Sequence, residues 1–150
     1  MKKCLIIYCS YHHFNTKKLV TEISKKFYEI ETLCLPINGT INLDNYEFIG
    51  FASGIYMGKP AQVLLEFIKN NSSSLQGRKV FFILTSGTNS IKYKRQFKKF
   101  LENIGCTVRE DYSCKGYDTY GFFKFIGGIS KGHPNRKDIS NAISYCESLK

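Results

Sequence analysis

Residues 4–16 read CLIIYCSYHHFNT, an apolar run followed at once by a polar turn that carries hydroxyls, an amide and two imidazoles. After the turn, Leu19, Val20, Ile23 and Phe27 recur at the spacing of one helix face. A buried strand that leads through a polar turn into a one-sided helix is the first unit of an alternating α/β fold. The rest of the chain has to fit that class.

The same alternation continues along the 150 residues. Strand-length apolar runs are predicted at 5–9, 30–35, 48–52, 80–84 and 106–112. Helical patterns between and after them include those at 61–68, 97–104 and 139–146. Continuous apolar strands between one-sided helices predict a single domain, residues 1–150, with a parallel sheet covered on both faces. The serines at 72–74 are expected to form a loop that ends a helix.

The composition narrows the class of protein. Hydrophobic residues make up 43% and prolines number only three, which argues against disorder. No apolar run approaches the roughly 18 residues of a membrane helix, and the apolar run after Met1 is too short for a signal peptide. The six cysteines form no Cys-x-x-Cys pair, so we expect reduced thiols rather than a zinc ribbon or a redox motif. These features predict a cytoplasmic protein without a membrane span.

The formal net charge of +10 is the compositional outlier. A basic chain suits a nucleic acid, an anionic membrane or an acidic protein partner, or it simply has a solvated basic surface. Five basic residues within eight positions alternate with apolar ones on a predicted helix: Lys92, Lys94, Arg95, Lys98 and Lys99. This pattern is the outer face of an amphipathic helix and favours the solvated surface.

Polar and glycine-rich segments follow four of the predicted strands, at 10–16, 53–59, 85–90 and 116–133. In an open parallel sheet, ligands bind at the carboxyl ends of the strands. We therefore expect these four segments to meet at one site. The last of them is also too long to be only a connector.

The first segment suits an anion. Helix N-termini carry free N–H groups and the positive end of a dipole, and Ser10, Asn15 and Thr16 add short donors. Because the loop holds no Lys or Arg before the helix, neutral donors would bind a phosphate monoester. Ordinary capping of the helix by Asn15 or Thr16 is the alternative.

The nucleotide motifs are absent. No Gly-x-Gly-x-x-Gly follows the first strand, and the stretch at 54–60 lacks the spacing and the Ser or Thr of a P-loop. In the second segment, Tyr56 and Met57 stand between two glycines and could form an apolar wall against a flat ring, or be core residues on a turn. The backbone of the third segment could bond to the edge of a heterocycle.

Together these residues resemble the flavodoxin-like family over nearly the whole chain. The loop at 10–16 looks like its FMN phosphate loop, and 54–58 and 85–89 stand where its two loops beside the flavin ring stand. The run from Cys114 to Gly121 and on to 132–134 looks like a tail of small bacterial flavodoxin-like proteins. The resemblance implies a three-layer α/β/α sandwich, a five-stranded parallel sheet of order 2-1-3-4-5, and noncovalent FMN.

The resemblance also implies which residues hold FMN, with no catalytic or metal-binding residue among them. The phosphate would be held by Ser10, Asn15 and Thr16, together with the backbone of His12, His13 and Phe14. The ring would lie against Ser53, Gly54, Ile55, Tyr56, Met57 and Gly58, with Tyr56 stacked on it and a peptide at Gly58 that reorients on reduction. The pyrimidine edge would meet Thr85, Ser86, Gly87, Thr88 and Asn89, and Tyr117, Asp118 or Tyr120 would close the site.

Two features depart from the family. Most of its phosphate loops carry a glycine before the Asn-Thr pair, whereas here His13-Phe14 stands there and the loop is one residue longer. Typical flavodoxins are acidic, and acidic surroundings destabilise the anionic flavin hydroquinone. Because this chain is basic, we expect its lower reduction potential to be less negative than that of acidic flavodoxins.

The implied function is electron transfer by FMN, as a carrier or as a small flavin-dependent reductase. An FMN-dependent quinone or protoporphyrinogen-type oxidoreductase is the alternative. Partners would be redox proteins, acidic ones suiting the charge, and the acceptor could also be a small molecule such as a quinone.

Two remoter functions remain open. Ser53, Asp118 and His133 stand in the chain order of α/β-hydrolases, but the Gly-x-Ser-x-Gly elbow is missing. A nucleic-acid-binding module rests on charge alone. The adjacent His12 and His13 form no metal pair, and His133 is expected either to cap the last helix or to donate a proton near the flavin.

Overall fold

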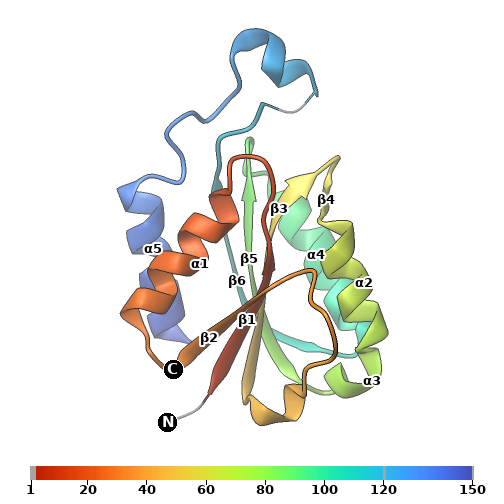
Figure 1. Cartoon of the computed structure of the whole chain (residues 1–150). Coiled ribbons are helices and arrows are strands. Elements are labelled where there is room, and N and C mark those ends of the chain that lie inside the picture. Colours follow the sequence, from red (N-terminus) through yellow and green to blue (C-terminus); the bar gives the residue numbers. More distant parts are fainter. Residues whose placement is uncertain (1–2, 120, 150) are drawn as a thin grey trace.

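Five parallel strands form the centre of the computed structural model, which describes residues 3–119 and 121–149 (Figure 1). They are β1 (Cys4–Cys9), β2 (Ile30–Cys34), β3 (Phe48–Tyr56), β5 (Lys79–Ser86) and β6 (Thr107–Lys115). The sheet order is β2-β1-β3-β5-β6, and a two-residue strand, β4 (Lys59–Pro60), pairs antiparallel with β3. Counting the parallel strands alone, this order is the predicted 2-1-3-4-5.

Helices cover both faces of the sheet. In Figure 1, α1 (Asn15–Lys26) and α5 (Arg136–Ser148) lie on one side, and α2 (Gln62–Asn70), α3 (Ser72–Leu75) and α4 (Ile91–Ile104) lie on the other. Two 3₁₀ turns, η1 (Leu43–Asn45) and η2 (Gly121–Ile126), complete the elements. The three-layer prediction is therefore confirmed. None of the described helices is long and apolar enough to cross a membrane.

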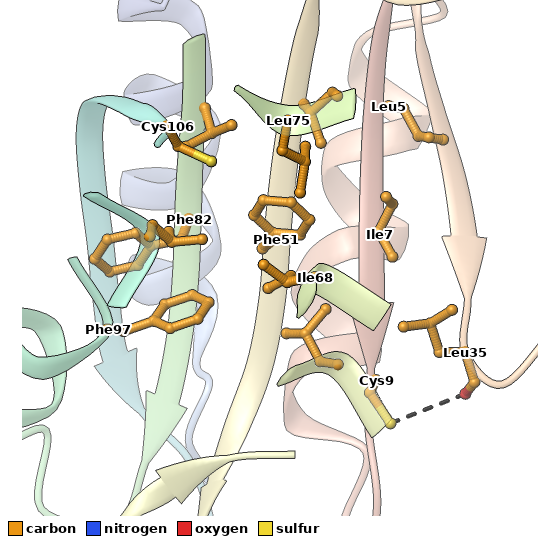
Figure 2. Packing of buried hydrophobic residues seen from close by; sticks show 14 of the residues in the cluster. Leu5, Ile7, Cys9, Leu35, Phe51, Ile68, Leu75, Phe82, Phe97 and Cys106 are labelled. Carbon is orange, nitrogen blue, oxygen red and sulfur yellow. Dashed lines mark hydrogen bonds between the residues drawn. The ribbon is translucent and has the colours of Figure 1, made fainter. Parts of the chain in front are cut away.

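The core divides between the two faces. The α2 and α4 side holds a cluster that includes Phe51, Ile68, Phe82 and Phe97 (Figure 2). Phe82 and Phe97 meet edge to face, with ring centroids 5.0 Å apart. On the α1 and α5 side, residues such as Ile6, Leu19, Ile23 and Phe81 form the second cluster. β3 and β5 contribute to both clusters, which explains their unbroken apolar sequence.

Two local predictions were wrong. The serine run at 72–74 is not a loop but the body of α3, because Leu75 is fully buried and draws this turn onto the core. Residues 53–56 belong to β3 and not to a turn, since strand pairing with β5 and β4 continues through them. The turn is only Met57-Gly58, both at positive φ, as in tight two-residue hairpins.

The six cysteines are all free. Cys9, Cys106, Cys114 and Cys146 are buried, Cys4 is half-buried, and Cys34 is exposed. Burial raises the pKa of the Cys106 thiol to about 11 and the pKa values of the Cys4, Cys114 and Cys146 thiols to about 12. These four thiols are therefore largely protonated at neutral pH and shielded from reagents.

We predict that a disulfide reagent at pH 8 labels Cys34 alone in the folded protein. A thiol of pKa near 12 holds roughly one thiolate in ten thousand molecules at this pH, so the other thiols react far more slowly. The measurement is the number of thiols titrated before and after addition of denaturant. Cys34→Ser is the control that should abolish the fast reaction, and a second fast thiol in native protein would contradict the prediction.

Candidate functional site

A cavity of ≈ 250 Å³ lies at the carboxyl ends of the strands. Figure 1 shows these ends at the top of the view, below the chain segment that carries η2. All four segments line the cavity. The lining residues are Tyr11, His12, His13, Asn15, Thr16, Gly54, Ile55, Tyr56, Thr85, Ser86, Gly87, Gly116, Tyr117, Asp118, Thr119 and Lys124.

Twelve of these sixteen residues were predicted from the sequence as site residues. Seven predicted residues are not among the lining: Ser10, Phe14, Ser53, Met57, Gly58, Thr88 and Asn89. Tyr120 lies outside the described residues. Sequence reasoning missed Tyr11, Gly116, Thr119 and Lys124, although all four stand within the predicted polar segments 10–16 and 116–133. Lys124 lies within η2 and far from any strand end, so its position did not indicate that it reaches the cavity.

The turn before α1 exposes backbone donors. Phe14 precedes the first helical residue in the left-handed conformation, with φ of 55°, and no side chain caps the helix there. A bulky residue in this conformation costs about 1–3 kcal/mol, because the left-handed region favours glycine. The Ser10 hydroxyl accepts from the amide of Lys17 at 3.1 Å. The amides of Asn15 and Thr16 precede the first i to i−4 bond of the helix and are free of helical partners.

Asn15 and Thr16 do not cap α1 but tie it to other segments. The Asn15 amide Nδ2 donates to the carbonyl of Tyr117 at 2.9 Å. The buried Thr16 hydroxyl shares a hydrogen bond of 3.0 Å with the hydroxyl of Thr85. The capping alternative is therefore wrong. Since one of these two hydroxyls donates to the other, the second O–H remains to donate elsewhere.

Tyr56 forms one wall of the cavity. Its hydroxyl accepts from the amide of Tyr11 at 2.9 Å, and the two rings lie 5.3 Å apart. Burial raises the pKa of Tyr56, and a side-chain hydrogen bond with Cys9 helps raise that of Tyr11 to about 12. Both phenols are therefore neutral at physiological pH. Neighbouring Met57 is 79% exposed and does not share in this wall.

The third and fourth segments approach each other at Gly87. A Cβ there would lie 2.9 Å from a carboxylate oxygen of Asp118 and 2.7 Å from Ile129, so only glycine allows this contact. The Ser130 hydroxyl donates to the carbonyl of Gly87 at 2.6 Å. At Asn89, φ is 50° and the amide donates to the Ser86 hydroxyl, which closes the third turn on itself.

Residues 117–119 and 121–129, here named the arm, border the cavity through Tyr117, Asp118, Thr119 and Lys124. Asp118 and Ile129 exchange two backbone hydrogen bonds of 3.0 and 2.8 Å, so the arm is closed at its base. His13 links the arm to the first segment, with Nε2 2.9 Å from the Thr119 hydroxyl and its ring centroid 4.3 Å from that of Tyr117. The cavity is thus enclosed by contacts between segments a hundred residues apart.

The hydrolase reading finds no support in this geometry. The Ser53 hydroxyl is fully buried, donates to the carbonyl of Gly54 and accepts from the amide of Ala61. His133 Nδ1 lies 2.7 Å from the carboxylate of Asp138, which belongs to the capping box of α5. His133 therefore supports the start of α5, as one of its two expected roles. Among the described residues, no group of three His, Cys, Asp or Glu could hold a metal ion.

We predict that Asn15→Ala loosens the arm. Losing a partly buried hydrogen bond costs roughly 1 kcal/mol, so the amides of Asp118 and Ile129 should exchange hydrogen about fivefold faster. Amide exchange read by mass spectrometry or NMR measures this. Asn70→Ala, at the exposed end of α2, is the matched control. Unchanged exchange at the arm would contradict the role of Asn15.

Comparison with known proteins finds similarity to a family of flavodoxin domains. A family model described as a flavodoxin domain matches residues 5–125. An uncharacterized protein of Methanocaldococcus jannaschii is 35% identical over 98% of this chain and 97% of its own length.

Solved structures share the fold at low identity. Oxidised flavodoxin 1 of Bacillus cereus has a TM-score of 0.68 at 15% identity, covering 98% of this chain and 97% of that one. A flavoprotein of Lactobacillus acidophilus, solved in complex with FMN, has a TM-score of 0.64 at 20% identity, covering 75% of this chain and 93% of that one.

Proposed function

Because the chain belongs to the flavodoxin domain family, we propose that it binds FMN noncovalently and mediates electron transfer, as a carrier between proteins or as a small flavin-dependent reductase. The observation that carries the proposal is the cavity at the strand ends, where all four expected segments meet. FMN supplies the redox chemistry when bound, and the chain supplies binding, orientation and electrostatics.

The donor set fits a flavin nucleotide. The free amides at the start of α1, with the hydroxyls of Ser10, Thr16 and Thr85, would hold the phosphate without any Lys or Arg side chain. Tyr56 would pack against the ring, and the close approach at Gly87 leaves backbone near the ring edge. The Gly58 peptide of the hairpin turn stays, in this proposal, the one that reorients on reduction.

The cavity measures ≈ 250 Å³, close to the lower end of small-molecule sites, which usually span about 300–1,000 Å³. A flavin bound there would take up much of this space. An edge of the flavin left at the surface would suit exchange of electrons with another protein. The six free thiols support action in a reducing compartment such as the cytoplasm.

Reconstitution with FMN tests the proposal. The purified chain should be yellow or take up FMN, release it in acid, and bind FMN at least tenfold more tightly than riboflavin, which lacks the phosphate. Tyr56→Ala should weaken FMN binding roughly tenfold, because an aromatic contact contributes about 1–1.5 kcal/mol. Quenching of flavin fluorescence measures both affinities.

Tyr28→Ala is the matched control for Tyr56→Ala, since Tyr28 is 80% exposed and far from the cavity lining. It should leave FMN affinity unchanged. A colourless chain that takes up neither flavin would refute the proposed function.

Lys124 should set the reduction potential. It is the one Lys or Arg among the described residues that lines the cavity, and the reduced flavin is anionic at neutral pH. A nearby positive charge stabilises that anion, so Lys124→Ala should lower the midpoint of the last reduction step by tens of millivolts. A spectroscopic redox titration measures the midpoint. Lys137→Ala on the exposed side of α5 is the control, and equal midpoints in the two variants would contradict the role of Lys124.

A further inference from the structure

We propose that the rim of the cavity, formed by segments within residues 10–18, 54–62, 85–92 and 115–134, is a docking surface for an acidic redox protein. The net charge of this partner is opposite to that of the basic partner that an acidic flavodoxin would bind. The proposal rests on the proposed function for its purpose, because electrons that leave the reduced flavin are taken up by the redox centre of the docked protein. Its physical basis lies in the distribution of exposed apolar and charged side chains.

Exposed apolar residues gather at this rim. Seven large apolar side chains are exposed in the described part of the chain, and five belong to the segments that enclose the cavity. These five are Tyr11, Phe14, Met57, Phe125 and Ile126. Phe14, Met57 and Phe125 are 54%, 79% and 76% exposed. A sixth, Ile91, begins α4 just after the third segment, and only Tyr28 lies elsewhere. Such a cluster on a soluble domain marks an interaction site.

The same rim carries a strong excess of positive charge. Residues 10–18, 54–62, 85–92 and 115–134 contain seven lysines and a single acidic residue. The lysines are Lys17, Lys18, Lys59, Lys92, Lys115, Lys124 and Lys131. The acidic residue, Asp118, lines the cavity itself. An approaching partner therefore meets a positive field around the mouth.

Apolar and positive groups are paired side by side. The ammonium of Lys17 lies 5.7 Å from the ring centroid of Phe14, and that of Lys124 lies 5.4 Å from the ring centroid of Phe125. One partner residue can thus contact an aromatic face while a neighbouring carboxylate meets the lysine. This combination is the usual make-up of a protein interface with an apolar centre and a charged rim.

The backbone conformation of two exposed rim residues also supports a docking role. Phe14 and Met57 both have positive φ, at 55° and 52°, a conformation that favours glycine. Neither side chain is buried in compensation, since both are more than half exposed. Burial in the core therefore does not explain a bulky residue at either turn tip. Contact with a partner would account for both exposed side chains.

The outer face of α4 beyond its first turn is the competing basic surface, with Arg95, Lys98 and Lys99 exposed. None of the exposed large apolar residues in the described part of the chain lies on this part of α4. An anionic membrane would also attract lysines and aromatics, and the vesicle measurement below separates it from a protein. Because the rim combines exposed apolar residues with an excess of lysines, it fits a protein partner better than α4 does.

NMR titration of the ¹⁵N-labelled full chain, loaded with FMN where it binds, tests the proposal. The probes are an acidic ferredoxin and, as a partner of opposite sign, basic cytochrome c. Ferredoxin should shift the amides of segments 10–18, 54–62 and the arm, and its affinity should fall at least tenfold between low salt and 0.3 M salt. Cytochrome c should bind at least tenfold more weakly than ferredoxin.

The double variant Lys17→Glu/Lys59→Glu probes the rim, because neither residue lines the cavity. It should weaken ferredoxin binding at least tenfold, whereas the control Lys26→Glu/Lys69→Glu should change it less than twofold. Both control lysines are exposed and stand near the C-terminal ends of α1 and α2.

Several results would overturn the proposal: shifts confined to α4, equal binding by the two double variants, preference for cytochrome c, or absent binding to ferredoxin at low salt. Sedimentation with phosphatidylserine vesicles that requires Lys17 and Lys59 would replace the protein partner with a membrane. The NMR titration detects docking through the protein amides and does not depend on the flavin signal. FMN uptake is measured by absorbance, so failure of the proposed function can be distinguished from failure of the docking proposal.

Discussion

Parallel pairing of β1 with β3, of β3 with β5 and of β5 with β6 is the constraint on which the site depends. The register aligns Cys9 with Ser53, Gly54 with Thr85, and Ser86 with Lys115. The chain therefore leaves each of these strands at nearly the same level of the sheet. Ser10, Thr85 and Gly116 reach one edge from positions far apart in the sequence, and the Thr16–Thr85 and Asn15–Tyr117 hydrogen bonds are possible only because of that alignment.

The architecture could be predicted from the sequence because apolar strands and one-sided helices have distinct periods. The end of β3 could not be predicted, since Ser53 and Gly54 look like turn residues although strand pairing continues through them. It also misled at the start of α1. Asn15 and Thr16 are good capping residues, yet their side chains bond to Tyr117 and Thr85 instead. Tertiary partners decided these positions, and no local pattern reports them.

The site shows the same division. Residues at the end of a strand or directly after it, such as Thr85 and Gly87, could be assigned to the cavity from position alone. Lys124 could not, because it enters the cavity through the arm, which turns back on itself at the Asp118–Ile129 bridge. Phe14 was assigned to the site for its place in the loop. Its conformation fits the loop, but its side chain is 54% exposed and does not line the cavity.

The closed base of the arm has a consequence for how such proteins diverge. Because Asp118 and Ile129 bond to each other, residues between them can be inserted, deleted or exchanged without moving β6 or α5. Natural selection can thus change the arm independently of the rest of the fold. Descendants of one ancestral gene could then acquire new binding partners while keeping the same sheet and helices.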